Sequence, residues 1–586
     1  MRPSFIPLLA STAPMFAPEA ERAQSLLDGL ACGAISRRRF LELLGGAGLA
    51  ATLAPSAVEA ALVAGDNQRE RRRRLRASYD YIIVGAGAAG CIIAAELAKA
   101  GADVLLLEAG GDDQLPEVQT PGIWFTNIGT SRDWRFAAAP SPDVDNRRIP
   151  IAMGRVLGGG TSINALLWVR GLASDFDAWR DAGCPGWGFA DILALYKRME
   201  DWQGGANEWR GVGGPVPVRT VSTPHPTAQA FIAGCKDLGI PILEDVNGPM
   251  REGAGYVNMT VTSDGYRASA SRCFLRPELG RHNLTLLLDT PVTHLLFRGT
   301  RCRGVRLQRG QVPKNIACTR EVIVTSGGLG SAKLLMLSGV GDAANLQALG
   351  IDPVVDLRAV GDNFQDHPLL CGVVFKYRGP MPPRSPTSNA VEAAAYVRSN
   401  AGTQEPDIKM VLQQLPLMTP ELRARYPIAS SDAFTISPAL VRPTSRGTLR
   451  LTSARFDHKA RLEANFLSTE ADMAATVRCI EMCRELGTQA GFSEVRESEL
   501  VPGGRLDDRG LRDFARLSTI SFGHPVGTCR MGAGAGSVVD PALKVHGIEG
   551  LRVADSSIMP RIITGPTSAA THAIALKASD LLLNRS

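Results

Sequence analysis

The sequence predicts an α/β fold made of two intertwined domains. Residues 79–108 hold two short apolar runs, separated by a glycine-rich turn and an Ala-rich helical pattern, and this order is typical of a βαβ unit. Residues 369–516 hold alternating strand patterns, such as the one at 447–451, and few motifs. The chain has 586 residues, which exceeds the usual size of a single domain.

The glycine-rich turn of the βαβ unit carries Gly85, Gly87 and Gly90 in a G-x-G-x-x-G arrangement. The first glycine makes the tight turn, the second lets the backbone approach a pyrophosphate, and the third allows close packing of helix on strand. The free N–H groups at the start of the helix favour negative charge. Glu108 ends the second strand, close to the spacing expected for a carboxylate that binds ribose hydroxyls. The sequence therefore predicts a Rossmann-like domain that binds an adenine dinucleotide.

A second glycine-rich run at 154–165 contains three consecutive glycines followed by Thr161, Ser162 and Asn164. Three glycines in a row permit backbone contact with a flat ligand that side chains would block. This run closely resembles the first signature of the glucose–methanol–choline (GMC) oxidoreductase family. The resemblance covers most of the chain, from Tyr79 to Leu582, and it implies a GMC-type FAD-binding domain with an antiparallel-sheet substrate domain over the open face of the flavin.

The resemblance implies FAD as the cofactor and assigns its contacts. In the family the first signature lies along the flavin and the diphosphate, which points to Gly158, Gly159, Thr161 and Asn164. Some members attach FAD covalently through a histidine beside the matching asparagine, but Ile163 fills that place here, so non-covalent FAD is implied. Later segments imply the remaining contacts: backbone near Val292 at the adenine, Ala554 and Asp555 at the diphosphate and ribityl chain, and Ser568 at the start of a helix aimed at the flavin pyrimidine.

Two further segments carry the same resemblance. Residues 326–341 look like the second family signature, with Ala332 where proline is usual. Residues 361–368 resemble a family stretch that contains Asp366 and His367. We interpret His367 as a structural hydrogen-bonding residue rather than a catalyst.

The reacting centre is predicted at residues 521–532, which match the family's His-Pro-x-Gly-Thr-x-x-Met-Gly stretch and single out His524. Hydride leaves an alcohol carbon more readily once the hydroxyl proton has gone, and a neutral imidazole is the natural proton acceptor near neutral pH. The second His or Asn of the family falls on Pro566, whose side chain has neither donor nor acceptor. The residues that can take over its role are Thr564, Thr567, Ser568 and His572, the last of which we interpret as a core or surface histidine.

The N-terminus is typical of an export signal. Residues 36–41 read Ser-Arg-Arg-Arg-Phe-Leu, and a mildly apolar run at 43–53 leads to small residues ending at Ala60. The paired arginines resemble a twin-arginine signal, and the apolar run is shorter than the roughly 20 residues that span a bilayer. We expect a signal peptide at 1–60, the twin-arginine translocase as a partner during export, and a periplasmic or secreted protein. A surface amphipathic helix with an arginine patch is the alternative.

The remaining domain boundaries are a basic linker at 61–77, the first part of the FAD-binding domain at 78–368, the substrate domain at 369–516, and the C-terminal part of the FAD-binding domain, with His524, at 517–586. The net charge of +6 comes almost entirely from six arginines between Arg69 and Arg76. Such a run is typical of a solvated linker, so no nucleic-acid partner is expected.

Composition excludes several other classes. A hydrophobic fraction of 45% and a charged fraction of 21% are those of an ordinary globular protein rather than a disordered or fibrous one. Eleven scattered cysteines do not form a disulfide framework. Cys479 and Cys483 lie one helical turn apart with no accompanying histidine cluster, so we expect buried thiols there and no metal site.

The predicted function is oxidation of a small-molecule alcohol to an aldehyde or ketone by hydride transfer to the flavin, with His524 as the base. The electron acceptor is oxygen, a quinone or another carrier. Two alternatives stay open, namely a hydroxynitrile-lyase-like enzyme that uses the same histidine without redox chemistry, and a flavin-binding protein that lacks activity.

Overall fold

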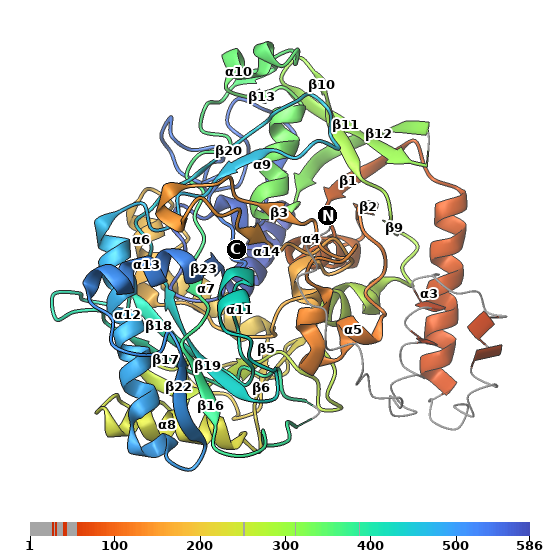
Figure 1. Ribbon diagram of the computed structural model, residues 1–586. Helices are drawn as coiled ribbons and strands as arrows, with labels where there is room; N and C mark the ends of the chain where they lie inside the picture. The colour runs from red at the N-terminus through yellow and green to blue at the C-terminus, as the bar shows by residue number, and fades with distance from the viewer. Residues whose placement is uncertain are drawn as a thin grey trace.

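The computed structural model describes residues 26–27, 30–31, 39–40, 42–43, 55–249, 252–310, 312–385 and 387–585. Two large sheets organise the chain, and each draws its strands from separate parts of the sequence (Figure 1). The first takes strands from 78–107, 284–324 and 551–553, and the second takes strands from 253–256, 368–440 and 496–521. This arrangement confirms the predicted fold class, a Rossmann-like domain combined with a domain built on an antiparallel sheet.

The first sheet has seven strands in the order β10-β11-β12-β1-β2-β9, with β24 beside β12. Its central strands run parallel, and β10 and β11 extend it in antiparallel fashion. Every residue of β2 and β9 is buried, as expected for a parallel sheet covered by helices on both faces. The elements of this domain are β1 (Ser78–Val84), α4 (Ala88–Lys99), β2 (Val104–Leu107), β9 (Leu284–Leu287), β10 (Val292–Arg298), β11 (Arg301–Arg309), β12 (Val312–Val324), α9 (Gly327–Leu337), β24 (Leu551–Val553) and α14 (Ser568–Leu583).

The second sheet has eight strands in the order β22-β16-β19-β18-β17-β7, with β15 joined to β19 and to β23. Its neighbouring strands are antiparallel. Helices α8 and α12 pack on one face in a separate hydrophobic core. The elements are α8 (Pro226–Asp237), β7 (Gly253–Tyr256), β15 (Pro368–Leu370), β16 (Val374–Tyr377), β17 (Ala393–Val397), β18 (Ile408–Gln413), β19 (Ala433–Leu440), α12 (Glu470–Thr488), β22 (Arg496–Val501) and β23 (Thr519–Ser521).

The substrate-domain sheet is not confined to residues 369–516. β7 and α8 come from the segment that the sequence assigns to the FAD-binding part, and β23 comes from the C-terminal part. The chain therefore crosses between the two sheets four times: before β7, before β9, before β15 and before β24.

Residues 61–77 differ from the solvated linker that their charge predicts. Most of them belong to helix α3 (Pro55–Arg73), which lies beside β9 at the right of Figure 1. The amide of Gln68 donates to the carbonyls of Leu279 and Leu284 at 2.9 Å and accepts the N–H of Leu286 at 3.0 Å. The prediction of a linker is wrong because polar side chains of this helix, Arg72 among them, bond backbone groups beside β9. Arg73, Arg74 and Arg76, at and after the end of the helix, are exposed.

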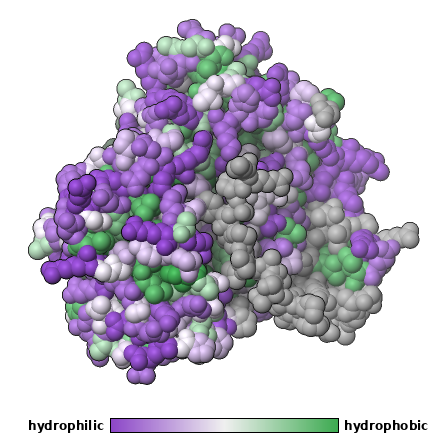
Figure 2. Space-filling view, in the orientation of Figure 1, coloured by the Kyte–Doolittle hydropathy of each residue, from purple (hydrophilic) through white to green (hydrophobic). Residues whose placement is uncertain are grey.

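The predicted signal peptide at 1–60 lies mostly outside the described residues, and Arg37 and Arg38 are among those left out. No helix within the described ranges is both long and apolar enough to cross a membrane. The ten cysteines of the described part are all free thiols, and Cys479 and Cys483 are buried in the core under the second sheet. Hydrophilic residues predominate on the face drawn in Figure 2, where hydrophobic residues form separate groups.

Shorter elements connect the two sheets and complete the described chain. They are α5 (Pro116–Gln119), η2 (Pro121–Asn127), β3 (Phe136–Ala137), η3 (Pro142–Val144), β4 (Pro150–Ile151), η4 (Gly159–Ser162), α6 (Ala173–Asp181), α7 (Phe189–Met199), β5 (Glu200–Trp202), β6 (Val216–Thr220), β8 (Asn258–Met259), η5 (Ser271–Leu275), η6 (Arg276–Glu278), β13 (Val340–Gly341), α10 (Ala343–Ala348), β14 (Val355–Asp356), α11 (Pro420–Arg425), β20 (Thr448–Arg450), β21 (Arg461–Glu463), η7 (Ala490–Phe492), α13 (Asp508–Ser518) and η8 (Ser556–Ile558).

Candidate active site

Two histidines from distant segments meet at the edge of the second sheet. His367 directly precedes β15, and His524 follows β23. These strands pair antiparallel with Pro368 opposite Ser521, which brings the two imidazoles together. Their Nδ1 atoms lie 2.9 Å apart, and the rings are nearly perpendicular at 84°. A hydrogen bond between the two Nδ1 atoms therefore links His367 to the residue that the sequence predicts as the base.

A buried carboxylate fixes the backbone that carries His524. Asp366 accepts the N–H of His524 at 2.9 Å and the hydroxyl of Ser521. Burial is the largest cause of the rise in the pKa of Asp366 to about 7. Asp366 and His367 therefore hold the backbone and the ring of His524 respectively, which gives the 361–368 segment a direct role in the site.

The contact between the two Nδ1 atoms requires one ring to donate and the other to accept. Nε2 of His367 is buried and has no hydrogen-bond partner among the described residues. When His524 carries its proton on Nδ1, His367 is the acceptor, and Nε2 of His524 carries a lone pair for a substrate hydroxyl.

Both imidazoles are neutral at physiological pH. Burial, followed by the charge of Lys409, lowers the pKa of His367 to about 3. Burial, then His367 and Lys409, lower the pKa of His524 well below its usual range. A base that must take up a proton has to be neutral beforehand, and this environment keeps His524 in that form.

The glycine turn at β1 has the shape that a bound diphosphate requires. Gly85 has φ of +104°, and a Cβ there would lie 2.6 Å from the carbonyl oxygen of Thr325. A Cβ at Gly90 would lie 1.9 Å from the carbonyl oxygen of Gly85, so this position needs glycine for packing. At Gly87, in contrast, the nearest atoms to a Cβ are 4.0 Å away. The side of Gly87 is therefore open, as the approach of a ligand to the backbone demands.

The second glycine run lies against this turn. Gly158 donates its N–H to the carbonyl of Ala86 at 2.8 Å, and a Cβ at Gly159 would lie 2.7 Å from Cα of Gly87. Both Gly158 and Gly159 have positive φ, at +82° and +54°. The structure thus brings the two predicted cofactor loops into direct contact, and their arrangement fits an extended dinucleotide.

Thr161 and Asn164 hold the loop in shape. The hydroxyl of Thr161 donates to the carbonyl of Gly158 at 2.6 Å and accepts the N–H of Ala270 at 3.1 Å. The side-chain oxygen of Asn164 accepts from the buried guanidinium of Arg267 at 2.8 Å. Arg267 also donates to the carbonyl of Thr161 at 3.0 Å. Sequence reasoning missed Arg267, because no local motif marks a clamp that lies about 100 residues away.

Glu108 is positioned by the same turn. Its carboxylate accepts the N–H groups of Ala86 at 3.0 Å and Gly110 at 2.8 Å, and burial raises its pKa to about 7. A carboxylate has about four acceptor positions, so capacity remains for ribose hydroxyls. Thr290 donates its N–H to the carbonyl of Glu108 at 2.8 Å, which places Val292, at the start of β10, close to the same strand end.

The C-terminal segments complete the cofactor side. Ala554 follows β24 and donates its N–H to the carbonyl of Val324 at 3.0 Å. The Asp555 carboxylate accepts the N–H of Gly327, at the start of α9, at 2.8 Å and the hydroxyl of Ser331, so it fixes two elements to each other. Ser568 begins α14, which packs against α4.

Thr564 and His572, two of the residues predicted to take over the role lost at Pro566, are engaged elsewhere. The hydroxyl of Thr564 donates to Asp175 at 3.0 Å, and its N–H donates to the same carboxylate at 2.7 Å. His572 lies between the rings of Trp168 and Phe274 and hydrogen-bonds the carbonyl of Ser568 at 2.7 Å. His572 is therefore a core residue, and burial lowers its pKa to about 4.

Two more polar side chains of the second sheet lie near the histidine pair, and sequence reasoning missed both. Tyr396 on β17 and Lys409 on β18 are buried, and Lys409 acts on the pKa of both His367 and His524. The available signal was a single lysine inside the apolar run 408–412, where a charge is expensive to bury.

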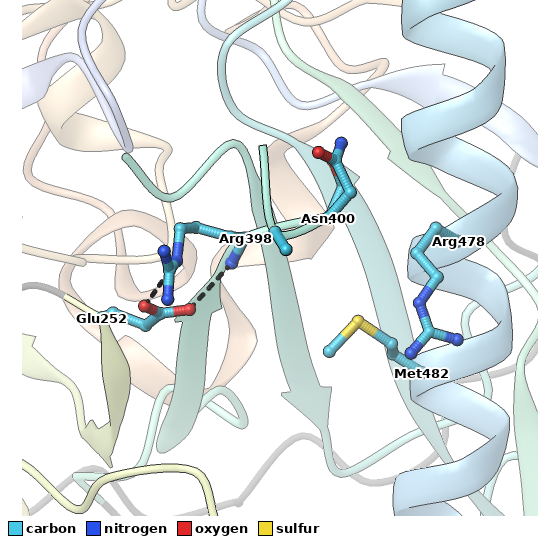
Figure 3. A pocket seen from close by; sticks show the side chains of 7 residues that line it. Glu252, Arg398, Asn400, Arg478 and Met482 are labelled. Carbon is cyan, nitrogen blue, oxygen red and sulfur yellow. Dashed lines mark hydrogen bonds and ion pairs between the residues drawn. The ribbon is translucent and has the colours of Figure 1, made fainter. Parts of the chain in front are cut away.

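The surface hollow drawn in Figure 3 is separate from this centre. It has a volume of about 320 Å³ and is lined by the residue before β7, by the loop after β17 and by α12, namely Glu252, Arg398, Ser399, Asn400, Ala401, Arg478 and Met482. An ion pair between Arg398 and Glu252 crosses it at 2.8 Å. It contains none of the predicted site residues. No group of three or more His, Cys, Asp or Glu side chains able to hold a metal occurs among the residues that the structure covers.

Comparison with known proteins identifies the family. Models of the GMC oxidoreductase family match residues 79–369 and 443–575. Oxygen-dependent choline dehydrogenases of Brucella ovis and Sinorhizobium medicae are 36% and 35% identical, over 86% of this chain and 96% of theirs. Among solved structures, pyridoxine 4-oxidase from Mesorbium loti matches with a TM-score of 0.83 and 31% identity, over 87% of this chain and 100% of that one. The chain therefore belongs to the GMC oxidoreductase family, whose members act on CH–OH donors.

Proposed function

We propose that this protein oxidises an alcohol to an aldehyde or ketone, with FAD as the cofactor and His524 as the base. The observation that carries the proposal is the hydrogen bond between His367 and His524. With the shared proton on Nδ1 of His524, Nε2 of that ring is a neutral acceptor for the hydroxyl of an alcohol.

The proposed cofactor is bound without a covalent link. The open side of Gly87 and the positive-φ glycines of the 158–159 turn fit the diphosphate, and the start of α14 fits the flavin end. Ile163 is buried and has no nucleophilic atom, which supports non-covalent binding. When bound, FAD supplies the two-electron acceptor for the hydride of the alcohol carbon.

The protein's own contribution is to bind the alcohol and remove its hydroxyl proton. Nε2 of His524 takes up that proton, and the ring becomes positively charged. The lone pair on Nδ1 of His367 then accepts a charge-assisted hydrogen bond from His524, which stabilises the new cation in its buried surroundings. His367 is thus a positioning residue that acts through His524.

The relatives support a CH–OH donor and favour oxygen as the final electron acceptor. Two of them are named for choline and pyridoxine, both of which are alcohols, and their names include "oxygen-dependent" and "oxidase". Assays of the purified protein with oxygen and with a quinone, at equal alcohol concentration, decide which acceptor this chain uses.

The test of the proposed function is anaerobic stopped-flow reduction of the purified yellow protein by a panel of alcohols. We expect flavin bleaching by wild type and a loss of roughly 10²–10⁴-fold in His524→Ala, the range that general-base catalysis supplies. His458→Ala, which removes an exposed imidazole, is the matched control, and its flavin should be reduced at the wild-type rate.

Acid should release the flavin intact if it is bound without a covalent link. A His524→Ala protein with wild-type rates would remove the base from the proposal, and a flavin that no alcohol bleaches would refute alcohol oxidation.

We also propose export by the twin-arginine route, on the sequence of residues 36–60. Cleavage near Ala60 would retain the half of α3 that carries Asn67, Gln68 and Arg72, the residues that bond the backbone near β9. Changing Arg37, Arg38 and Arg39 to lysine should keep the protein in the cytoplasm with its N-terminus uncut. Equal periplasmic yield of this variant would exclude the twin-arginine route.

A further inference from the structure

The two faces of the second sheet differ in chemistry because side chains alternate along each strand. On β18, Ile408, Met410 and Leu412 face the hydrophobic core under α12. The alternate positions, Lys409 and Val411, face the other way. Val411 packs in a cluster with Leu166, Leu167 and Phe522, so this face looks toward the glycine loop and the reacting centre.

Lys409 stands beside Tyr396 on that face. The two residues are directly opposite each other in the β17–β18 register. Nζ of Lys409 lies 4.8 Å from the ring centroid of Tyr396 and 5.8 Å from that of Phe522. The Phe522 ring in turn lies 4.7 Å from the ring of His524. One aromatic side chain therefore neighbours both the lysine and the predicted base.

Neither polar group has a partner in the described part of the chain. Nζ of Lys409 and the hydroxyl of Tyr396 are both buried and make no hydrogen bond there. Two buried carboxylates next to strands of this sheet are already engaged: Asp366 by Ser521 and His524, and Glu392 by Ser388 and His225. Burial alone accounts for the lowered pKa of Lys409, about 7, with no carboxylate acting to raise it.

A buried ammonium without a counter-ion is costly to fold, so its presence on the substrate face calls for an explanation. A bound carboxylate would supply the missing negative charge. Its two oxygens match the two unused donors, the ammonium of Lys409 and the hydroxyl of Tyr396. A single positive charge balances a carboxylate completely, whereas a phosphate dianion would leave one charge buried.

We propose that Lys409 and Tyr396 bind a carboxylate of the substrate, so that the alcohols taken by this protein are hydroxy acids. The inference rests on the proposed function for the oxidation itself. It also predicts a substrate unlike that of the relatives named for choline, because the positive charge of Lys409 would repel a cationic substrate. The groups that face Lys409 are Tyr396 from β17, Ala439 from β19, Phe522, and the His367–His524 pair.

The first experiment measures kcat and KM of the holoenzyme for matched pairs of alcohols. The pairs are 4-(hydroxymethyl)benzoate with 4-(hydroxymethyl)benzamide, and glycolate with glycolamide, and choline is added as a cation. We expect the acid of at least one pair to exceed its amide at least tenfold in kcat/KM, mainly through KM, and choline to be poor. Lys409→Met should abolish that preference. Lys376→Met is the control, since Lys376 lies in the same sheet but is ion-paired to Glu497 on the surface.

The second experiment needs no turnover. Calorimetric titration of oxidised holoenzyme with 4-methylbenzoate and with acetate should give binding of at least one. Lys409→Met should weaken that binding at least tenfold, while Lys376→Met should not. Affinity should also fall as pH rises above about 7, where the buried ammonium loses its proton. Lys409→Met should melt no lower than wild type, because replacing an unpaired buried charge by an apolar side chain is often stabilising.

The outcomes separate the two proposals. Equal use of acids and amides, or an unchanged acid preference in Lys409→Met, would overturn the carboxylate site and leave alcohol oxidation standing. Failure to oxidise any alcohol while 4-methylbenzoate or acetate binds through Lys409 would overturn the oxidation alone. Absence of binding by both carboxylates would overturn the carboxylate site.

Discussion

The Nδ1 atoms of His367 and His524 lie 2.9 Å apart, although the two residues are 157 positions apart in the sequence. The pairing of β15 with β23 produces this contact. The second imidazole near the base therefore comes from the segment before β15. It does not come from the loop before α14, where Pro566 stands at the position of the family's second His or Asn.

His367 is expected to act by accepting the Nδ1 proton of His524. His367→Leu removes the acceptor and should slow flavin reduction by about 10–100-fold, the worth of a hydrogen bond to a charged group. His367→Asn places an acceptor oxygen at the δ position and should recover most of the rate. Stopped-flow reduction at saturating alcohol measures both, and the flavin content of each variant is checked first. Equal rates in the Leu and Asn variants would show that His367 only fills space.

The pH dependence of flavin reduction should report the lowered pKa of His524. Protonation disables the base, so the rate falls only when pH drops below that pKa. Because burial, His367 and Lys409 all lower the pKa of His524, the acid limb should lie well below pH 6.5. In that pH range Lys409 is charged, since its own pKa is about 7. Lys409→Met should therefore move the limb to higher pH, which stopped-flow traces from about pH 4 to 8 can measure with a neutral alcohol. A limb that stays in place, or moves to lower pH, would contradict the predicted coupling.

The sequence predicts those parts of the site that depend on local chemistry. Gly85, Gly87, Gly90 and Glu108 belong to one continuous βαβ unit, whose order fixes their arrangement. The sequence does not predict contacts between strands that are far apart along the chain. The sequence predicts His367 as a structural hydrogen-bonding residue, and its ring does form a hydrogen bond. It does not predict the partner, His524, because the pairing of β15 with β23 brings the two residues together.

The same limit explains two other differences. Lys409 lies in a strand buried on both sides, where apolar residues occupy both faces and no alternation marks the polar position. The arginine run before Ser78 predicts a solvated segment, but Gln68 and Asn67 anchor it as a helix by binding carbonyls near β9. Charge patterns predict exposure of a face well, and they do not predict which few polar side chains find backbone partners.

Gly87 provides a test of the dinucleotide site. Gly87→Val should fold, since the nearest atoms to a Cβ there are 4.0 Å away, but its side chain would occupy the place proposed for the diphosphate. We expect a colourless protein with near-normal secondary structure. Gly379→Val is the control and should purify yellow, because Gly379 is exposed and a Cβ there would have no atom within 4 Å. The ratio of flavin absorbance to protein absorbance measures the flavin content. Full flavin content in Gly87→Val would refute the predicted path of the diphosphate.

Pro566 is the site where the chain departs from its family, and the structure narrows the alternatives. Thr564 is bound to Asp175, and His572 is packed between aromatic rings, so neither is free to meet the alcohol. His367 already supplies an imidazole next to His524. We therefore expect Pro566→Asn to preserve or raise the rate of flavin reduction, because the new amide adds a polar group at the position of the family's second His or Asn without removing one.

The opposing hypothesis is that Pro566 fixes the loop through its locked φ, so that Thr567 or Ser568 reaches the alcohol. In that case Pro566→Asn should lose rate, and Thr567→Val or Ser568→Ala should lose nearly as much as His524→Ala. Stopped-flow reduction of the four variants under one set of conditions distinguishes the two, provided that each retains its flavin.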